Sequence, residues 1–299
     1  MNLLITGAWQ QAKDYIPEIE KKHSVKFLQY EKDKLPCNPE WVEGTIGNGV
    51  FLSHPIEQFT NLRYIQLTSS GFDRVRMDYV KEKAIKIYNA KGVYSVPMAE
   101  YAISEVLSLY RKHNIFWEKQ KNCSWEKERN LRELFGKTVC ILGCGSVGTE
   151  CAKRFDAMGC VVYGIKREIR EQNYFRCIYS KNDLKEVLGK SDIIIVTLPL
   201  TEQTLYFLNE DMLTSIKDDA VLVNISRGSL IEPEALLKEL RKGRFSAILD
   251  VFEEEPLPED SELWELKNVI ITPHNSFIGE GNGKRLSNVI MKIIEEYCE

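Results

Sequence analysis

Short apolar segments alternate with longer polar segments along the whole chain. In the first 95 residues the apolar runs are four to six residues long, and the polar stretches between them are more helical in pattern. These runs are predicted to be strands, at residues 3–6, 25–30, 49–52, 64–68 and 86–89. Buried strands separated by helices are typical of a parallel sheet in an α/β fold.

The same alternation restarts in the second part of the chain. Residues 99–110 are apolar with helical periodicity and follow Pro97, which predicts a helix beginning after that proline. Six further strands are predicted, at residues 138–142, 160–165, 192–198, 220–225, 246–250 and 269–272. Helices are expected at 149–158 and 283–297. The chain therefore divides into two predicted α/β units, residues 1–95 and 96–277.

Composition excludes several classes of protein. The charge balance is 40 basic against 44 acidic residues, a net charge of −4, which disfavours binding to nucleic acid or to an anionic membrane. The N-terminus lacks the pattern of a signal peptide, and no apolar stretch is long enough to span a bilayer. The eight cysteines form no CxxC pair, so we expect free buried thiols, a cytoplasmic protein and no metal site.

A glycine-rich turn joins the predicted strand at 138–142 to the helix that follows it. Its sequence is Gly143-Cys144-Gly145-Ser146-Val147-Gly148. In the strand–turn–helix context the first glycine permits the tight turn. The second lets a pyrophosphate approach the backbone, and the third lets the helix pack closely on the strand. The free N–H groups of the helix N-terminus attract the phosphates. The pattern predicts a dinucleotide site.

The end of the next strand indicates which dinucleotide is bound. Lys166 and Arg167 stand where NAD-binding proteins carry an acidic residue for the ribose hydroxyls. Cations at this place suit the 2′-phosphate of NADP, so NADP(H) is favoured and NAD(H) remains the alternative. A solvated run of charges is the other interpretation, because Glu168 and Glu171 lie among these cations. Residues 166–176 nevertheless carry four cations and two acids, a local charge of +2.

Three later strands end in chemically active side chains. Arg227 follows the strand at 220–225, Asp250 and Glu255 follow the next, and His274 follows the strand at 269–272. Because ligands bind at the carboxyl ends of strands in open α/β sheets, a cation, a carboxylate and an imidazole are expected at one edge. Taken singly, each could be a surface or core residue without chemistry.

The order and spacing of these motifs resemble the D-isomer-specific 2-hydroxyacid dehydrogenase family. The resemblance covers nearly the whole chain. It also rests on four further segments, which are residues 64–75 with Ser69-Ser70-Gly71-Phe72-Asp73, Asn89-Ala90-Lys91-Gly92, Ala99-Glu100, and Leu198-Pro199-Leu200-Thr201-Glu202-Gln203-Thr204. The resemblance implies hydride transfer between NAD(P)H and a small 2-oxo acid, such as glyoxylate, hydroxypyruvate or a branched analogue.

The resemblance also implies a role for each site residue. Arg227 would bind the substrate carboxylate and polarise the ketone, and His274 would be the general acid in reduction. Glu255 would hydrogen-bond His274 and favour its protonated form. The backbone of Ser70 and Gly71 would grip the carboxylate. The implied cofactor contacts are Gly143, Gly145, Ser146, Val147, Gly148, Lys166, Arg167, Leu198, Pro199, Thr204, Ile225 and Asp250, the last holding the nicotinamide carboxamide.

For architecture, the resemblance implies a flavodoxin-like substrate domain and a Rossmann-like nucleotide domain. The first would comprise residues 1–95 and 278–299, the second residues 96–277, with the active site in the cleft between them. Residues 99–133 resemble the family's dimerisation arm, and a homodimer is expected.

Two other functions are compatible with the sequence. A dehydrogenase of a phosphorylated hydroxy acid, of phosphoglycerate type, could use Arg63, Arg74 and Arg76 near the substrate loop to bind the phosphate. A nucleotide-sensing protein could keep the fold without turnover, although Arg227, Glu255 and His274 argue against it.

Overall fold

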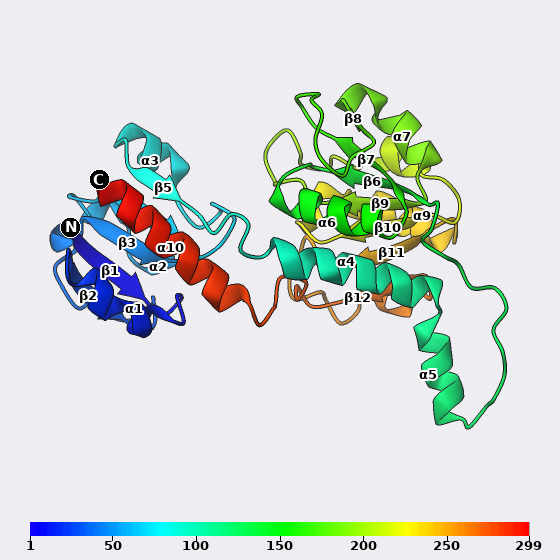
Figure 1. Cartoon of the computed structure of the whole chain (residues 1–299), viewed down its shortest axis with the longest axis horizontal. Helices are drawn as coiled ribbons and strands as arrows, with labels where there is room; N and C mark the ends of the chain where they lie inside the picture. Colours follow the sequence, from blue (N-terminus) through cyan, green and yellow to red (C-terminus); the bar gives the residue numbers. More distant parts are fainter. Residues whose placement is uncertain (299) are drawn as a thin grey trace. The chain divides into compact units, whose positions relative to one another are not determined.

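The computed structural model describes residues 1–298, which form two compact units (Figure 1). Unit 1 comprises Met1–Tyr94 and the segment from Gly279 onward, and unit 2 comprises Ser95–Ile278. Each unit is built on one parallel sheet, which confirms the α/β prediction.

Unit 1 has the strand order β2-β1-β3-β4-β5, with every neighbouring pair parallel. This is the flavodoxin-like order. The strands are β1 (Asn2–Thr6), β2 (Ser24–Leu28), β3 (Gly44–Gly47), β4 (Tyr64–Leu67) and β5 (Lys86–Tyr88). The helices are α1 (Ala12–Ile19), α2 (Val50–Ser53), α3 (Met77–Glu82) and α10 (Asn282–Cys298). Short 3₁₀ helices lie at Pro39–Trp41 and Ile56–Gln58.

The C-terminal helix α10 completes the core of unit 1. Its apolar residues Leu286, Ile290 and Ile294 recur every fourth position, so they form one stripe that packs on the same face of the sheet as the buried Trp9. The indole N–H of Trp9 donates to the Ser287 hydroxyl at 2.9 Å. The last helix of the chain is therefore part of the first unit (red beside blue in Figure 1).

The predicted strand at 49–52 is wrong. That apolar run forms helix α2, and the strand lies just before it, at β3. The sequence of β3, Gly-Thr-Ile-Gly, carries a weak apolar signal because its glycines are required by packing. A Cβ added at Gly44 would lie 2.7 Å from Leu3 Cδ2 and 3.0 Å from Tyr64 Cδ1, so the neighbouring strands leave no space for a side chain.

Unit 2 has the strand order β12-β11-β10-β9-β6-β7-β8, again with parallel neighbours. The strands are β6 (Thr138–Leu142), β7 (Val161–Ile165), β8 (Cys177–Tyr179), β9 (Ile193–Val196), β10 (Val221–Asn224), β11 (Ser246–Leu249) and β12 (Val269–Ile271). The connections reverse direction between β6 and β9, which is the switch point of a doubly wound, Rossmann-like sheet.

Helices cover both faces of this sheet (Figure 1). One face packs against α4 (Ser95–Tyr110) and α6 (Ser146–Ala157), the other against α7 (Leu184–Lys190), α8 (Glu210–Thr214) and α9 (Pro233–Arg241). Helix α5 (His113–Lys121) extends away from the sheet. The remaining short 3₁₀ helices are Lys181–Asp183, Gly228–Leu230 and Glu262–Glu265.

Several elements of unit 2 differ from the prediction, and helix α6 begins at Ser146, three residues before its predicted start at 149. Helix α4 begins at Ser95, four residues earlier than expected, with Pro97 inside its first turn, where a missing N–H costs no hydrogen bond. Strand β8 was not predicted, because its three residues sit at the sheet edge and only Ile178 is buried.

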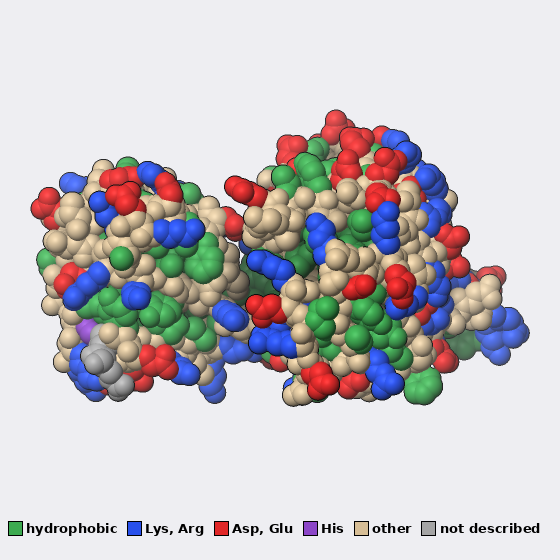
Figure 2. Space-filling view, turned by 90° about the horizontal axis from the view of Figure 1, so that it is seen from above, with side chains coloured by type: hydrophobic (Ala, Val, Ile, Leu, Met, Phe, Trp, Pro, Cys, Tyr) green, Lys and Arg blue, Asp and Glu red, His purple; other side chains and the backbone are tan. Residues whose placement is uncertain are grey.

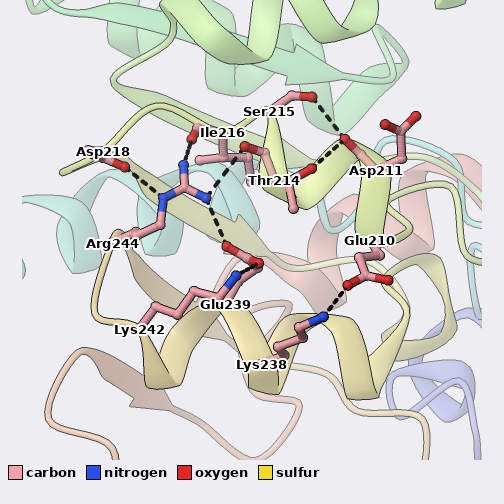
Figure 3. Close-up of polar contacts among 10 residues, drawn as sticks. All are labelled: Glu210, Asp211, Thr214, Ser215, Ile216, Asp218, Lys238, Glu239, Lys242 and Arg244. Carbon is pink, nitrogen blue, oxygen red and sulfur yellow. Dashed lines mark hydrogen bonds and ion pairs between the residues drawn. The ribbon is translucent and has the colours of Figure 1, made fainter.

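A polar cluster ties α9 to neighbouring loops of unit 2 (Figure 3). The Glu239 carboxylate is fully buried and pairs with Lys242 Nζ at 2.5 Å and Arg244 Nη1 at 2.8 Å. Arg244 also donates from Nε to Asp218 at 2.7 Å and from Nη2 to the Ile216 carbonyl. Burial alone would raise the pKa of Glu239, but the hydrogen bonds and charges of Lys242 and Arg244 outweigh it and lower that pKa.

The seven cysteines whose side chains the structure describes are free, but only four of them are buried. Four of the cysteines, Cys140, Cys144, Cys151 and Cys160, are free and buried as predicted. Cys123 and Cys177 are exposed, which corrects the expectation of buried thiols there, and the side chain of Cys298 lies outside the described part.

Basic and acidic side chains are intermingled on the visible face of each unit (Figure 2). Among residues 1–298, no helix combines the length and apolar character that a membrane crossing requires.

Candidate active site

The carboxyl edge of the unit 2 sheet collects the predicted site residues of that unit. The glycine turn follows β6, the Leu198 loop follows β9, and Arg227 follows β10. The Asp250–Glu255 loop follows β11 and His274 follows β12. Because all these strands are parallel and adjacent, their loops leave the sheet on the same side.

His274 and Glu255 are in contact. Nδ1 of His274 lies 2.8 Å from Glu255 Oε2, and Glu255 Oε1 accepts the Phe252 backbone N–H at 3.0 Å. The neighbouring Glu253 instead accepts the Tyr206 hydroxyl at 2.6 Å. Among these acids, Glu255 is thus the one placed to orient the imidazole. The His274 and Glu255 side chains are 40% and 37% exposed, so solvent and ligands can reach them.

Asp250 organises the turn that carries His274. Its carboxylate is fully buried and accepts hydrogen bonds from the Thr272 hydroxyl at 2.6 Å, Asn275 N at 2.7 Å and Ser276 N at 2.9 Å. The Asp250 carbonyl accepts the His274 N–H at 2.8 Å. The structure therefore gives this carboxylate a role within the protein. Its predicted contact with the nicotinamide carboxamide stays a prediction.

Arg227 begins the loop that packs against the Glu255 loop. Its Nη1 donates to the Ser226 carbonyl at 2.8 Å, and its own carbonyl accepts from Asn224 Nδ2 at 2.9 Å. A Cβ added at Gly228 would lie 1.9 Å from the Phe252 carbonyl carbon. Only glycine allows these two loops to approach so closely, and this approach brings the Arg227 loop beside the acid-bearing loop.

The glycine turn has the geometry that a pyrophosphate needs. Gly143 has φ +99°, in the left-handed region, and a Cβ added at Gly148 would lie 2.0 Å from the Gly143 carbonyl oxygen. A Cβ added at Gly145 would meet no described atom within 4 Å, which leaves room for a ligand. Within the described residues, no side chain caps the N-terminus of α6, whose residues Ser146 and Val147 offer backbone N–H groups. The turn therefore fits a dinucleotide.

Gln172 links the cation at the end of β7 to this turn. Its amide nitrogen donates to the Cys144 carbonyl at 3.2 Å and to Thr149 Oγ1 at 2.7 Å, and its oxygen accepts from Lys166 Nζ at 3.4 Å. Lys166 is half-buried, whereas Arg167 is exposed. Sequence reasoning missed Gln172, because a polar residue in a charged loop carries no local signal of such contacts.

The remaining predicted cofactor residues have mainly structural contacts. Thr204 Oγ1 donates to the Pro199 carbonyl and accepts from Thr201 N, both at 2.7 Å, which closes the loop after β9. Leu198 presents its carbonyl to the Ser226 hydroxyl. Ile225 is 1% exposed and packs in the core, so only its backbone is available to a ligand.

Ser70 and Gly71 lie in unit 1, in the loop after β4. This loop is tied to the loop after β5, because Asn89 Nδ2 donates to the Ser70 carbonyl at 2.6 Å and Ala90 N donates to the Ser69 carbonyl at 2.9 Å. The Ser69 hydroxyl donates to the Gly71 carbonyl at 3.1 Å. The loop is thus held by one hydrogen bond of its own and by two from the loop after β5.

Comparison with known proteins identifies the family. A family model described as the NAD binding domain of D-isomer specific 2-hydroxyacid dehydrogenase matches residues 103–276. The glyoxylate/hydroxypyruvate reductase A of Arabidopsis thaliana is 34% identical over 277 residues, covering 88% of this chain and 85% of that protein. This chain belongs to the D-isomer specific 2-hydroxyacid dehydrogenase family. It is therefore an oxidoreductase of the class that acts on CH–OH groups.

Further similar proteins extend the comparison. The glyoxylate reductase of Pyrococcus furiosus is 34% identical over 228 residues, covering 73% of this chain and 67% of that protein. Among solved structures, a family protein from Aeromonas salmonicida is 28% identical with a TM-score of 0.84, covering 99% of this chain and 96% of that one. The D-lactate dehydrogenase of Aquifex aeolicus, solved with NAD and lactic acid, is 26% identical with a TM-score of 0.82, covering 99% of this chain and 95% of that one.

Proposed function

We propose that the protein uses NAD(P)H to reduce a small 2-oxo acid to the corresponding D-2-hydroxy acid. The observation that carries this proposal is the 2.8 Å contact between His274 and Glu255, on the sheet edge that also bears the glycine turn. Relatives named as glyoxylate and hydroxypyruvate reductases support this class of substrate.

Each site residue has a defined task in this proposal. Arg227 binds the substrate carboxylate with its planar guanidinium, which matches two oxygens at once. With Nδ1 facing Glu255, Nε2 of His274 is the nitrogen that donates a proton to the ketone oxygen. Ser70 and Gly71 contribute backbone contacts to the carboxylate. When bound, the nicotinamide supplies the hydride.

The glycine turn and the end of β7 would hold the cofactor. Gly143, Gly145 and Gly148 shape the pyrophosphate site, and Ser146 and Val147 donate backbone N–H groups. We propose a preference for NADP(H), because Lys166 and Arg167 end β7 in place of an acidic residue. A family member from Xanthobacter autotrophicus, 26% identical and solved in complex with NADPH, supports this proposal.

A screen of 2-oxo acids tests the function. The purified chain is mixed with glyoxylate, hydroxypyruvate and branched 2-oxo acids, each with NADPH and NADH, and absorbance at the nicotinamide band is followed. Turnover of at least one 2-oxo acid, faster with NADPH, is expected. A chain that binds nucleotide but turns over none of these acids would instead be a nucleotide-sensing protein that keeps the fold without turnover.

The alternative of a phosphorylated substrate is weakened because two of the arginines that would bind the phosphate are paired with acids. Arg63 lies before the amino end of β4, opposite the substrate loop, and pairs with Glu43 at 2.9 Å. Arg76 is engaged by Glu57 and Asp78. Two of the three cations offered for a phosphate are therefore already paired with acids.

We further propose a homodimer formed through α5 and the segment after it. Apolar side chains are exposed there, including Trp125 at 99% and Trp117 at 62%. Sedimentation of the wild-type chain should give a dimer, and Trp125→Ala should weaken it; a wild-type monomer at micromolar concentration contradicts the proposal. The free state of the seven cysteines whose side chains the structure describes supports a reducing, cytoplasmic location.

A further inference from the structure

A chain of hydrogen bonds connects helix α4 to the turn that carries His274. The Tyr101 hydroxyl lies 2.6 Å from Thr272 Oγ1, and Thr272 Oγ1 lies 2.6 Å from Asp250 Oδ1. A threonine hydroxyl has one proton, and here it faces a carboxylate, which accepts only. Thr272 therefore donates to Asp250, and Tyr101 donates to Thr272.

The chain ends on a carboxylate that holds the residues after His274. Asp250 is fully buried and also accepts the backbone N–H groups of Asn275 and Ser276. Together with the Thr272 hydroxyl, these donors compensate the burial of its charge. The backbone carbonyl of the same residue accepts the His274 N–H. Asp250 thus forms hydrogen bonds with residues on both sides of His274 in the sequence, and with the His274 backbone itself.

The backbone of His274 needs such support. Its φ is +51°, in the left-handed region that residues other than glycine seldom adopt. A strained conformation persists only where the surroundings hold it in place. In this conformation Nδ1 of His274 reaches Glu255, so the position of the ring depends on the turn.

We propose that Tyr101 and Thr272 are positioning residues for His274, acting through Asp250 from outside the reacting atoms. This inference rests on the proposed function of His274 as proton donor. Burial raises the pKa of Tyr101, so its hydroxyl stays protonated and remains a donor throughout the physiological range. Without the Thr272 hydroxyl, Asp250 loses one donor and Tyr101 loses its acceptor.

The central experiment compares Thr272→Val with Thr272→Ser in the full-length protein. Valine keeps the shape and removes the hydroxyl, whereas serine keeps the hydroxyl. We expect Thr272→Val to lower kcat at least tenfold, with the Kd for NADPH within twofold of wild type, because small displacements of a catalytic group cost large factors in rate. Thr272→Ser should stay within threefold. Thr214→Val, the same change on the exposed surface of α8, is the matched control.

A second variant tests whether the two hydroxyls act in one chain. Tyr101→Phe should also lower kcat, and the double variant Tyr101→Phe/Thr272→Val should be no slower than Thr272→Val alone. Multiplicative losses, or a Thr272→Val enzyme with wild-type kcat, would overturn the proposal. If Thr272→Val does not fold, the kcat of Tyr101→Phe is compared with that of wild type instead.

A readout independent of turnover separates this inference from the proposed function. Diethyl pyrocarbonate modifies accessible imidazoles, and mass spectrometry gives its rate at His274 with His54, a half-buried histidine outside α5, as internal reference. We expect Thr272→Val to change the His274 rate at least threefold and Thr272→Ser to leave it unchanged. Equal rates in all three proteins contradict positioning. If the wild type is inactive but Thr272→Val still changes the modification rate of His274, the proposed function is contradicted and the positioning role is supported.

Discussion

The imidazole of His274 and the carboxylate of Glu255 form a pair 2.8 Å apart, although 19 residues separate them in the sequence. They meet because β11 and β12 are adjacent and parallel, so the loops after both strands leave the same edge. The second oxygen of Glu255 is held by the Phe252 N–H, which orients the carboxylate. Because Nδ1 of His274 faces Glu255, Nε2 on the other side of the ring points away from this carboxylate.

Removing the imidazole tests its role as proton donor. His274→Ala should lower kcat roughly 10²–10⁴-fold, because that is the usual contribution of a general acid. Cofactor binding, followed by quenching of protein fluorescence, should persist, since the glycine turn is untouched. Near-normal turnover in His274→Ala would contradict the assignment.

The carboxylate that orients the imidazole is tested separately. Glu255→Gln keeps the shape of the side chain but removes its charge, and we expect kcat to fall roughly 10–100-fold, by analogy with the loss of a partner that orients a metal-bound histidine. Glu254→Gln, one residue away and exposed, is the matched control and should keep its rate. Equal losses in both variants would show that general charge, and not the contact with His274, is responsible.

Cofactor preference is predicted to depend on Lys166. Lys166→Ala should raise the KM for NADPH about tenfold or more and leave the KM for NADH nearly unchanged, since a charge-assisted hydrogen bond contributes about 1.5–3 kcal/mol. Gln172→Leu should shift the same ratio in the same direction, because Gln172 holds Lys166 beside the glycine turn. Arg176→Ala, an exposed cation of the same segment, should leave the ratio unchanged. A wild-type enzyme that prefers NADH overturns this prediction.

The buried carboxylate of Glu239 should make stability depend on acid. Its pKa is lowered on folding by Lys242 and Arg244, so its contribution is present above the unfolded pKa of about 4.3 and is lost as pH falls through the folded pKa. Glu239→Gln should reduce the free energy of unfolding by about 1–3 kcal/mol at pH 7, with the partly exposed cations moderating the loss. In urea melts this difference should shrink below pH 4. Glu234→Gln, exposed on the same helix, should have little effect at either pH.

Thiol reactivity should follow burial. The exposed Cys177, which lies outside the proposed dimer segment, should react first with iodoacetamide at pH 7.5. Burial raises the pKa of Cys144 to about 11 and that of Cys151 to about 12, so these thiols hold few reactive thiolates and should react only on unfolding. Mass spectrometry of the native protein checks this order, and rapid labelling of Cys151 would contradict it.

The sequence predicted most of the two sheets, because their strands are continuous apolar runs. Its failures have physical causes. Strand β3 is rich in glycine for lack of space beside Leu3, and the edge strand β8 buries a single residue. In the site, the resemblance led to Glu255 and His274, which the structure brings into contact. It did not lead to Tyr101, whose partner Thr272 lies 171 residues away, because such a contact depends on packing and leaves no local pattern.

The Thr197 hydroxyl gives the glycine turn a property of its own. From the residue after β9 it donates its single proton to the Gly143 carbonyl at 2.6 Å, and the Leu142 carbonyl lies 3.1 Å away. The residue after β9 thus holds the turn that follows β6. The shape of this turn is therefore fixed without a bound nucleotide. Ordering a loop costs conformational entropy, so a loop that is already ordered spends none of the binding free energy on its own folding. A preorganised turn of this kind binds without a conformational change of its own. The conformational entropy lost on association is then mainly that of the nucleotide.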